Sequence, residues 1–337
     1  MKITWFATGI DPSDTGRFES SRASTRFQCL IPAKILEALG HKINIIQSDK
    51  ISDPRKLTDK DFGDVNIFIK SFVQLDEFLA ERARQLNRKV IYSFCDFDFL
   101  RPEMMSHRKK MAELSHCCVT VSETLSKAVS KTLDIAKPIV ITDPYEGPHG
   151  TPKFAPSNNR LKLVWFGHIG NLQELFEQLD PLASFGQNIP VSLDIVAQSI
   201  DGIKEAFAQA NAKFKGHLAI HLTPWSLKNT WQSLAQSDAV IIPSVDNQKK
   251  MAKSPNRVVE SLRNGRFVVA HPVTSYFNYS DYIRIDSDII KGLSWMMENQ
   301  SEIKPLIHKG QAYIKQHNSP QAVADNWLKL LESIQNS

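Results

Sequence analysis

Short apolar runs alternate along the chain with longer segments whose apolar residues recur at helical spacing. In the first half, the runs predict strands at 3–7, 43–47, 65–70, 89–94, 117–122 and 138–142. Helical patterns lie between them at 27–39, 75–86, 103–114 and 123–133. Apolar strands separated by amphipathic helices are typical of a parallel sheet that is covered by helices on both faces.

The second half repeats this alternation. Strands are predicted at 161–166, 191–196, 218–222, 239–243 and 267–270, and helices at 171–179, 202–212, 226–236, 255–263, 287–299, 301–317 and 320–334. Prolines and glycines crowd the stretch between the halves and disfavour regular structure there. We expect an α/β protein with two doubly wound, Rossmann-like domains: a first domain at 1–145, a Pro-rich linker at 146–159, a second domain at 160–318 and a closing helix at 319–337. The carboxyl ends of the two sheets are expected to face a central cleft that binds ligands.

Composition supports a folded protein and excludes several classes. The chain has 337 residues, of which 42% are hydrophobic and 23% charged, and this length suits two domains of about 150 residues each. A net charge of +5, spread over both halves, argues against a nucleic-acid-binding protein. The four cysteines form no CxxC pair, which favours a reducing compartment.

Membrane segments are not expected, because no stretch reaches 18 apolar residues and the apolar run at the N-terminus is too short for a signal peptide. We therefore expect a cytoplasmic protein. The segment 101–110 mixes basic residues with methionines, which leaves open a peripheral contact with the inner face of the membrane and, as the alternative, a solvated helix face.

Several common catalytic motifs are absent. The sequence contains no GxGxxG after its first strand and no GxxxxGK[ST], HExxH or GxSxG anywhere. Its histidines are scattered, so no metal site is expected. Dinucleotide-binding, P-loop and zinc-protease chemistry are thus not indicated.

The most informative segment runs from the strand at 239–243 to the strand at 267–270. Ser254 followed by Pro255 predicts a helix start, and a helix N-terminus at the carboxyl edge of a sheet is a natural seat for phosphate. Lys253 and Arg257 would add charged hydrogen bonds to a diphosphate, and Glu260 could accept hydrogen bonds from a ribose diol. The alternative is a simple capping serine with a solvated lysine and an Arg257–Glu260 surface pair.

The run KSPNRVVESLRNGRFVVA (253–270) resembles the sugar-donor segment of the GT-B glycosyltransferases of family 4, also called group 1. The resemblance implies a GT-B fold whose last helix crosses back to the first domain, and retaining transfer from a nucleotide-diphosphate sugar without a cofactor or a required metal. It assigns the ribose to Glu260 and the diphosphate to Lys253, Ser254, Asn256 and Arg257. The family's pattern has a second glutamate eight residues before the one that matches Glu260, and that glutamate commonly contacts the transferred sugar. This sequence has Ala252 at that position, so the resemblance does not extend to the sugar contact.

The segment LVWFGHIGN (163–171) resembles the first strand and loop of the family's second domain. This likeness implies that Gly167 and Gly170 let the sugar donor approach the backbone, with His168 and Asn171 beside it. An ordinary turn from a strand into a helix, with Asn171 as the N-cap, is the alternative.

Acceptor-side residues are expected in the first domain. Gly9 follows the first strand, and Arg22 and Arg26 come later in the same loop, four residues apart. We expect the two arginines to contact an anionic acceptor or the phosphates of the donor. The alternative is that they lie on the surface without such a role. Asp96 and Asp98 follow the strand at 89–94. We prefer Asp96 as a base for the acceptor hydroxyl, which would give inversion if attack comes from the far face, and Arg257 as the group that stabilises the departing diphosphate. Helix capping or solvent exposure is the alternative for both aspartates.

These observations lead to one hypothesis and two rivals. The leading hypothesis is a glycosyltransferase that acts on a glycan, lipid-linked or other hydroxyl acceptor in the synthesis of bacterial surface polysaccharides or glycoconjugates. The first rival is a sugar-nucleotide epimerase of the same fold. The second is a degenerate, non-catalytic protein that only binds a nucleotide sugar.

Overall fold

Two compact units make up the protein. The computed structural model describes residues 1–12, 18–72, 74–99, 102–156, 160–198 and 200–336. Unit 1 contains Met1–Glu146, Met251–Ser254 and His317–Ser337, and unit 2 contains Gly147–Lys250 and Pro255–Gln316. The short segment 251–254, expected in the second domain, therefore packs with unit 1. Residues 147–156, expected in a linker, belong to unit 2.

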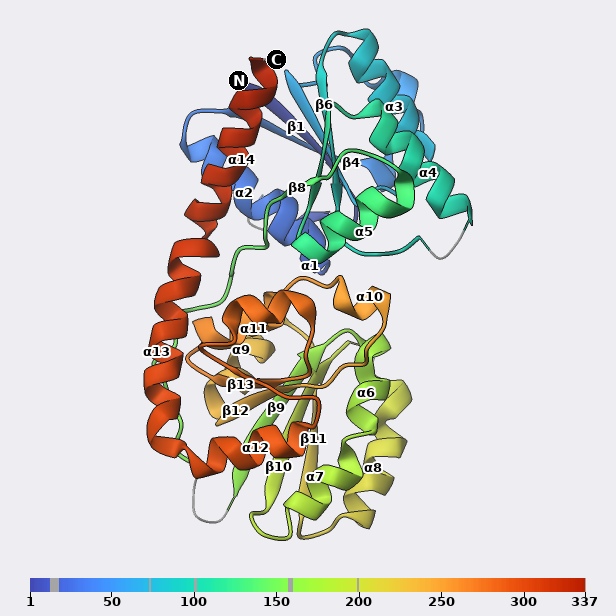
Figure 1. Ribbon diagram of the computed structural model, residues 1–337. Coiled ribbons are helices and arrows are strands. Elements are labelled where there is room, and N and C mark those ends of the chain that lie inside the picture. The colour runs from blue at the N-terminus through green and yellow to red at the C-terminus, as the bar shows by residue number, and fades with distance from the viewer. Residues whose placement is uncertain (13–17, 73, 100–101, 157–159, 199, 337) are drawn as a thin grey trace. The chain divides into compact units, whose positions relative to one another are not determined.

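Unit 1 is built on a six-stranded parallel sheet with the order β4-β1-β5-β6-β7-β8 (Figure 1). The strands are β1 (Lys2–Ala7), β4 (Lys42–Gln47), β5 (Val65–Ile69), β6 (Lys89–Phe94), β7 (Cys117–Thr120) and β8 (Ile139–Val140). A small antiparallel pair, β2 (Asp11–Pro12) and β3 (Phe18–Glu19), lies between the strands and helices that the sequence predicted. All six predicted strands of this half are therefore confirmed, the last two in a shorter form.

Helices cover both faces of this sheet because successive strand residues point to opposite sides. They are α1 (Ala23–Thr25), the π-helical turn η1 (Arg26–Leu30), α2 (Ile31–Ala38), α3 (Gln74–Gln85), α4 (Pro102–Leu114), α5 (Glu123–Leu133) and α14 (Pro320–Gln335), with short 3₁₀ turns η2 (Ser48–Lys50) and η3 (Pro54–Lys56). Trp5 packs in one core with residues of α2 and α14, whereas the neighbouring Phe6 packs with residues of α3 to α5.

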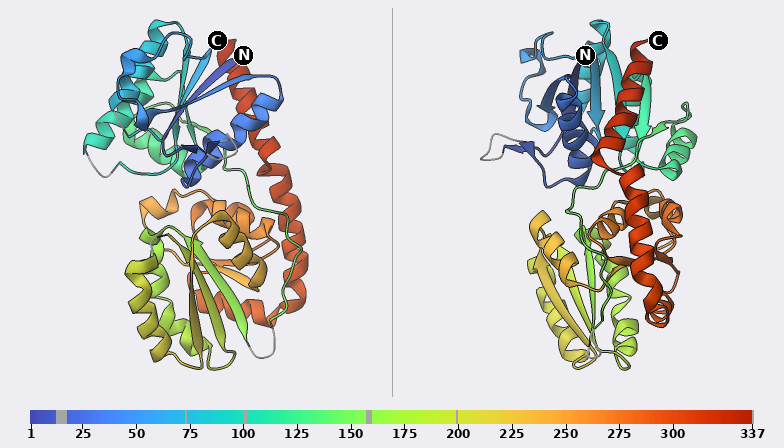
Figure 2. Two further views of the ribbon diagram at one scale, coloured as in Figure 1. Left: turned by 180° about the vertical axis from the view of Figure 1, so that it is seen from behind. Right: turned by 90° about the vertical axis from the view of Figure 1, so that its left-hand side faces the viewer.

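The C-terminal helix belongs to the first sheet, as expected. In α14 the fully buried Trp327 meets Trp5 edge to face, with ring centroids 6.3 Å apart. Figure 2 shows α14 running beside α2 from both directions. The helix is thus an integral layer of unit 1, although it is separated from the rest of that unit in sequence.

Unit 2 has the same architecture, with a parallel sheet in the order β11-β10-β9-β12-β13-β14. Its strands are β9 (Leu161–Gly167), β10 (Val191–Ala197), β11 (Leu218–Pro224), β12 (Ala239–Ile242), β13 (Phe267–Ala270) and β14 (Arg284–Ile285). Its helices are α6 (Leu172–Phe176), α7 (Leu179–Phe185), α8 (Lys204–Lys213), α9 (Leu227–Gln236), α10 (Gln248–Met251), α11 (Asn256–Arg263), α12 (Ile289–Glu298) and α13 (Gln300–His317), with 3₁₀ turns η4 (Ile169–Asn171), η5 (Ile200–Ile203) and η6 (Thr274–Tyr279). The α/β class predicted from the sequence is confirmed in both units.

The helix expected at 171–179 is confirmed only in part. α6 ends at Phe176, and a second helix that the sequence did not predict, α7, begins at Leu179 and contains Pro181 in its first turn. Proline has no backbone N–H, so a continuous helix would lose the hydrogen bond from residue 181 to residue 177. A new helix that starts just before the proline avoids this loss, because first-turn N–H groups have no helical partner.

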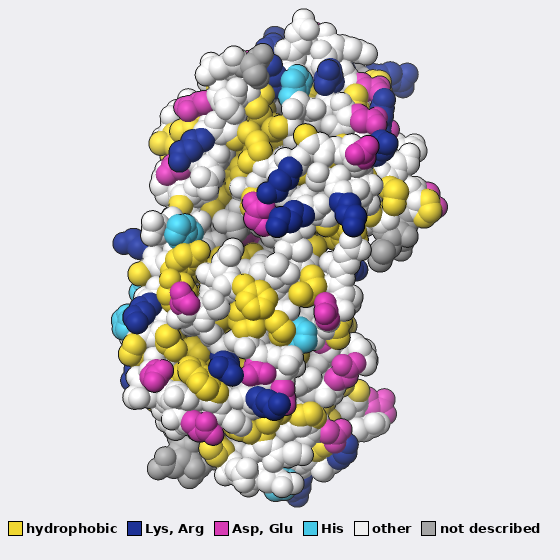
Figure 3. All heavy atoms as spheres, in the orientation of Figure 1, with side chains coloured by type: hydrophobic (Ala, Val, Ile, Leu, Met, Phe, Trp, Pro, Cys, Tyr) yellow, Lys and Arg dark blue, Asp and Glu magenta, His cyan; other side chains and the backbone are white. Residues whose placement is uncertain are grey.

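The surface carries charges of both signs. On the face shown in Figure 3, Lys and Arg side chains are interspersed with Asp and Glu side chains in each unit. Of the helices that the structure describes, none combines the length and the apolar character that crossing a membrane requires. All four cysteine thiols are free.

Candidate functional site

In unit 2 the sheet order reverses direction beside β9, because β10 lies on one side of it and β12 on the other. Ligands of open α/β sheets bind at the carboxyl ends of the strands at such a switch point. Gly167 ends β9 there. A β-carbon on Gly167 would lie 3.7 Å from Nη1 of Arg257, so the structure brings these two predicted residues together.

Arg257 lies in the first turn of α11 and presents an unsatisfied hydrogen-bond donor. Among the described residues, its Nη1 is buried and has no hydrogen-bond partner. An unpaired buried donor is costly, and a guanidinium group loses more than a neutral group does. The arrangement is therefore one that an anionic ligand would stabilise.

A second cation at this place was missed by sequence reasoning. The Lys250 ammonium, on α10, lies 2.5 Å from Glu174 Oε1 and donates to Asn171 Oδ1 at 2.6 Å. Burial favours the neutral form of Glu174, but the hydrogen bond from Lys250 and the nearby charge of Arg257 outweigh burial and lower the pKa of this carboxyl. Two cations and one carboxylate thus share the end of β9.

The predicted loop residues have different local roles. The ring of His168 accepts a hydrogen bond at Nδ1 from the backbone of Gly170, at 3.0 Å, and so caps η4. Asn171 precedes α6 but makes no capping bond, since its side-chain oxygen accepts from Lys250 instead. His168 and Gly170 are exposed beside this group.

The start of α11 differs from the prediction. The helix begins at Asn256 with Pro255 as its N-cap, and no side chain caps it, so the predicted capping role of Ser254 is wrong. Ser254 is instead a hydrogen-bond partner of Asp143 in unit 1. Lys253 also belongs to unit 1, so its assignment with Arg257 to one diphosphate site stays a prediction.

Glu260 is held against a glycine turn. Its Oε2 accepts a hydrogen bond from the Gly147 backbone N–H at 3.0 Å, and the residue is only 7% exposed. A β-carbon on Gly147 would lie 2.5 Å from that oxygen, so only glycine allows this approach. Arg263, one turn further along α11, donates to the Gly147 carbonyl at 3.2 Å.

In unit 1 the loop after β1 carries Gly9 and Arg22. Gly9 has a φ of +64°, and a β-carbon there would lie 2.5 Å from Arg22 Nε, so the guanidinium group covers this glycine directly. Arg22 is exposed and donates from Nη1 to Thr8 Oγ1. The two predicted residues therefore lie together at the end of β1.

Arg26 and Asp98 already have partners of opposite charge. Arg26 is buried and forms a two-pronged pair with Glu146, with its Nη2 2.8 Å from Oε1 and its Nε 2.9 Å from Oε2. Asp98 accepts from Arg108 Nη2 at 2.8 Å. Arg26 is thus an internal part of unit 1, whereas Asp98 is a partly exposed residue held by an ion pair.

Asp96 pairs with a lysine that the sequence did not single out. Its Oδ2 accepts a hydrogen bond from the ammonium of Lys70, the residue that follows β5. Burial opposes the charged form of Lys70, but Asp96 outweighs burial and raises the pKa of the lysine. Asp143, which follows β8, accepts from Gln28 at 2.7 Å, and burial raises its pKa to about 6.

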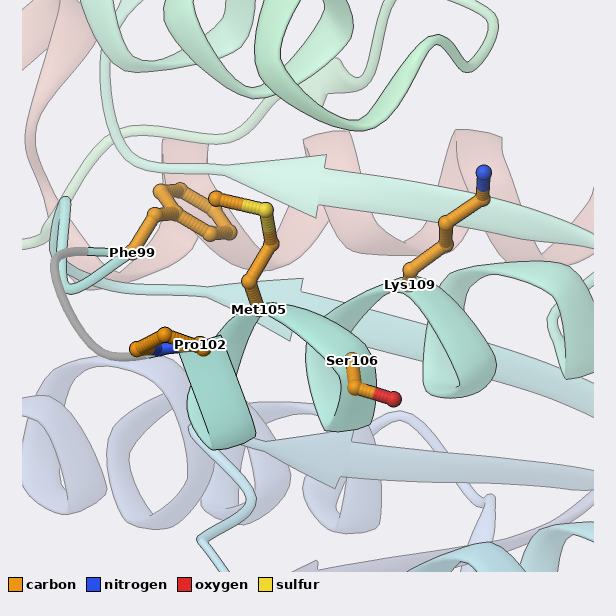
Figure 4. A pocket seen from close by; sticks show the side chains of 5 residues that line it. All are labelled: Phe99, Pro102, Met105, Ser106 and Lys109. Carbon is orange, nitrogen blue, oxygen red and sulfur yellow. The ribbon is translucent and has the colours of Figure 1, made fainter.

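Residues 102–110 of the predicted basic and apolar segment form the beginning of α4, and Arg101 lies outside the described residues. A pocket of about 420 Å³ lies there, lined by Phe99, Pro102, Met105, Ser106 and Lys109 (Figure 4). Contact of this segment with a membrane stays a prediction. Over the described part of the chain, no group of three or more His, Cys, Asp and Glu side chains is placed to hold a metal ion.

Sequence comparisons give no relatives, whereas structural comparisons do. No protein-family model and no curated protein matches the chain. The crystal structure of Anabaena Alr3699/HepE in complex with UDP is similar, with 14% identity and a TM-score of 0.68 over 99% of this chain and 100% of that one. A glycosyltransferase from Rickettsia africae has 12% identity and a TM-score of 0.71 over 99% and 98% of the two chains. The lipopolysaccharide outer core galactosyltransferase WaaB has 11% identity and a TM-score of 0.64 over 99% of both. The protein has the GT-B fold.

Proposed function

We propose that the protein is a glycosyltransferase that transfers a sugar from a nucleotide-diphosphate sugar to a hydroxyl group of a glycan or lipid-linked acceptor. The fold is shared with a protein described as a glycosyltransferase and with another whose crystal structure holds UDP. Fold similarity by itself leaves the activity open, because one fold hosts many functions. The residues at the carboxyl end of β9 must therefore support the proposal.

One observation carries it: the buried, unpartnered Nη1 of Arg257 beside Gly167. A diphosphate oxygen at this position would satisfy the guanidinium group, and Lys250 would supply a second positive charge. As the bond to the sugar breaks, negative charge grows on the diphosphate, and these fixed cations would stabilise it. A metal ion is not required for this role.

Glu260 is proposed to bind the ribose. A carboxylate that is fixed by a backbone N–H can accept hydrogen bonds from a vicinal diol without reorganising. The turn at Gly147 supplies that support at 3.0 Å. The retaining outcome, by contrast, rests only on the resemblance of residues 253–270 to family 4.

The acceptor and the place of action in the cell are part of the proposal. We propose an acceptor in bacterial polysaccharide or glycoconjugate synthesis and a place of action in the cytoplasm, at the inner face of the membrane. The apolar pocket beside Lys109 would suit such an acceptor. A lipid-linked acceptor would place its apolar chain against Phe99 and Met105.

A thermal-shift panel of UDP, GDP, ADP, CMP and dTDP sugars tests the proposal. Specific binding raises the melting temperature by mass action, and one nucleotide should give a clear rise. Arg257→Ala should abolish that rise, whereas Lys228→Ala, an exposed substitution on α9, should leave it intact. If no nucleotide shifts the wild type, or if Arg257→Ala binds as well as the wild type, the proposal is wrong.

Product analysis separates the proposed activity from its rivals. A transferase should hydrolyse the selected sugar nucleotide slowly in the absence of an acceptor, releasing free sugar and nucleoside diphosphate. An epimerase would instead convert the sugar nucleotide into an isomer. A protein that only binds would shift its melting temperature with no turnover.

A further inference from the structure

Residues 147–154 form neither a helix nor a strand, yet unit 2 fixes them along their length. We call this segment the strap, and it runs beside α13 in the views of Figure 1 and Figure 2. The Gly150 N–H donates to the Arg263 carbonyl at 2.9 Å, and the Phe154 ring is buried in the core of unit 2. Fixing irregular backbone costs conformational entropy, so contacts of this kind are needed to hold the strap in one conformation.

The strap meets the end of α11 backbone to backbone. A β-carbon on Gly150 would lie 2.2 Å from a backbone oxygen, that of Asn264, and one on Gly265 would lie 2.4 Å from the Thr151 carbonyl oxygen. Both distances are too short for a real β-carbon, so glycine is required at both positions. The strap therefore lies against the helix with little room for adjustment.

Two side chains hold the carbonyl groups of the strap. Arg263 Nε, on α11, donates to the Gly147 carbonyl at 3.2 Å. Gln311 Nε2, on α13, donates to the Gly150 carbonyl at 2.7 Å and to the Arg263 carbonyl at 3.3 Å. Gln311 is only 7% exposed, and a buried hydrogen bond is costly to leave unmade. The amide of Gln311 thus ties the strap, α11 and α13 together.

Gly147 connects this network to the carboxylate that is proposed to bind the ribose. Its N–H donates to Glu260 Oε2 at 3.0 Å, and its carbonyl accepts from Arg263. Glu260 and Arg263 are three residues apart on α11, so they lie on one face of the helix and hold Gly147 from the same side. A displacement of Gly147 would therefore move or release the Glu260 carboxylate. Every residue of this network lies in unit 2.

We propose that Arg263 and Gln311 are positioning residues that hold the strap so that Glu260 meets the ribose hydroxyls of the nucleotide. The inference rests on the proposed function, in which Glu260 binds the ribose. A carboxylate that is already fixed loses little freedom when it binds a diol, whereas a mobile one must first be ordered. The network is thus expected to make the site favour a ribonucleotide over a nucleotide that lacks the ribose hydroxyls.

Titration of the full chain with two ligands tests the inference. The ligands are the nucleoside diphosphate of the sugar nucleotide that gives the largest thermal shift and its 2′,3′-dideoxy analogue, which lacks both hydroxyls. Arg263→Met and Gln311→Leu remove the two donors and keep side chains of similar size, whereas Arg263→Lys keeps a cationic donor. Gln316→Leu, at an exposed position on α13, is the matched control. Each titration is made below the melting temperature of the variant.

Arg263→Met and Gln311→Leu should each weaken binding of the ribonucleotide by about 3- to 10-fold, the range expected for one hydrogen bond. Binding of the dideoxy analogue should stay unchanged, because that ligand makes no contact that depends on the position of Glu260. Arg263→Lys should restore most of the lost affinity. In the background of Glu260→Ala, neither Arg263→Met nor Gln311→Leu should weaken ribonucleotide binding further, because substitutions that act through one group are not additive.

Two results in the variants would overturn the inference. If Arg263→Met and Gln311→Leu weaken binding of both ligands equally, the two residues serve only to stabilise the fold. If both variants bind the ribonucleotide like Gln316→Leu, the strap does not position Glu260. A wild type that binds both ligands equally overturns the inference but leaves nucleotide binding in place, whereas a wild type that binds neither overturns the proposed function as well.

Discussion

Glu174 holds the ammonium of Lys250 at 2.5 Å, within the electrostatic reach of Arg257, whose Nη1 has no hydrogen-bond partner among the described residues. The carboxylate and an incoming diphosphate would therefore compete for the same cation. Removing the lysine and removing the carboxylate should therefore change nucleotide affinity in opposite directions.

Lys250→Ala should weaken nucleotide binding by about 10- to 100-fold, because a charge-assisted hydrogen bond to phosphate is lost. Glu174→Gln should strengthen binding, because a negative charge beside the diphosphate is removed. Isothermal titration at low and high salt measures both effects, which should shrink as salt rises. Lys249→Ala is the matched control, since Lys249 is an exposed lysine on the same helix. Weaker binding in Glu174→Gln would contradict the proposed competition.

A second prediction concerns the contact between Gly147 and Glu260. Gly147→Ala places a methyl group 2.5 Å from the present position of Glu260 Oε2, so the carboxylate must move. Nucleotide affinity should fall in Gly147→Ala nearly as far as in Glu260→Ala, if this carboxylate binds the ribose. Titration with the selected nucleoside diphosphate measures both.

Gly202→Ala is the control for this experiment, because a β-carbon there meets nothing within 4 Å. It should bind nucleotide like the wild type. Glu260→Ala that retains full affinity would show that the carboxylate serves only to fix the turn at Gly147.

The sequence predicts most of the fold but only part of the site. Local patterns suffice for the strands, because a continuous apolar run such as 163–166 indicates a strand that is buried on both faces. The break before Leu179 depends on a single proline, which the helical periodicity conceals. The pairs Lys250–Glu174 and Lys70–Asp96 join residues that are distant in sequence, so no local pattern reveals them.

Ser254 is a residue whose role the local sequence predicts wrongly. Its position before a proline is typical of a helix cap, yet the segment 251–254 packs with unit 1, where Asp143 engages the serine. Tertiary contact therefore overrides the local signal. The residues that sequence reasoning did place correctly together, Gly167 with Arg257 and Gly9 with Arg22, meet at strand ends, where the parallel topology dictates proximity.

A third prediction follows from the pKa of Asp143, which burial raises from 3.8 to about 6. The folded state therefore binds more protons than the unfolded state between these values, so this group's contribution to stability falls as pH rises from about 4 to 6. Asp143→Asn removes this dependence. The free energy of unfolding of Asp143→Asn relative to that of the wild type should rise by about 1–3 kcal/mol across the window and then level off.

Urea denaturation at a series of pH values measures this difference. Asp76, whose pKa burial also raises to about 6, should give the same sign when replaced by Asn. Asp246→Asn, at an exposed position in unit 2, is the control and should show no such window. A difference that is constant from pH 4 to 7 would contradict the burial argument.

The last prediction separates the stability of unit 1 from the chemistry of unit 2. Trp327→Ala removes a fully buried ring that packs against Trp5, and such truncations cost about 3–5 kcal/mol. The loss should appear in the unfolding of unit 1, because both rings lie in its core. Trp327→Phe should cost less, since it keeps an aromatic contact with Trp5.

Below the melting temperature of Trp327→Ala, nucleotide affinity measured by titration should equal that of the wild type, because Arg257, Lys250 and Glu260 all lie in unit 2. A large loss of affinity in a folded Trp327→Ala protein would show that the α14 layer is needed to bind the nucleotide.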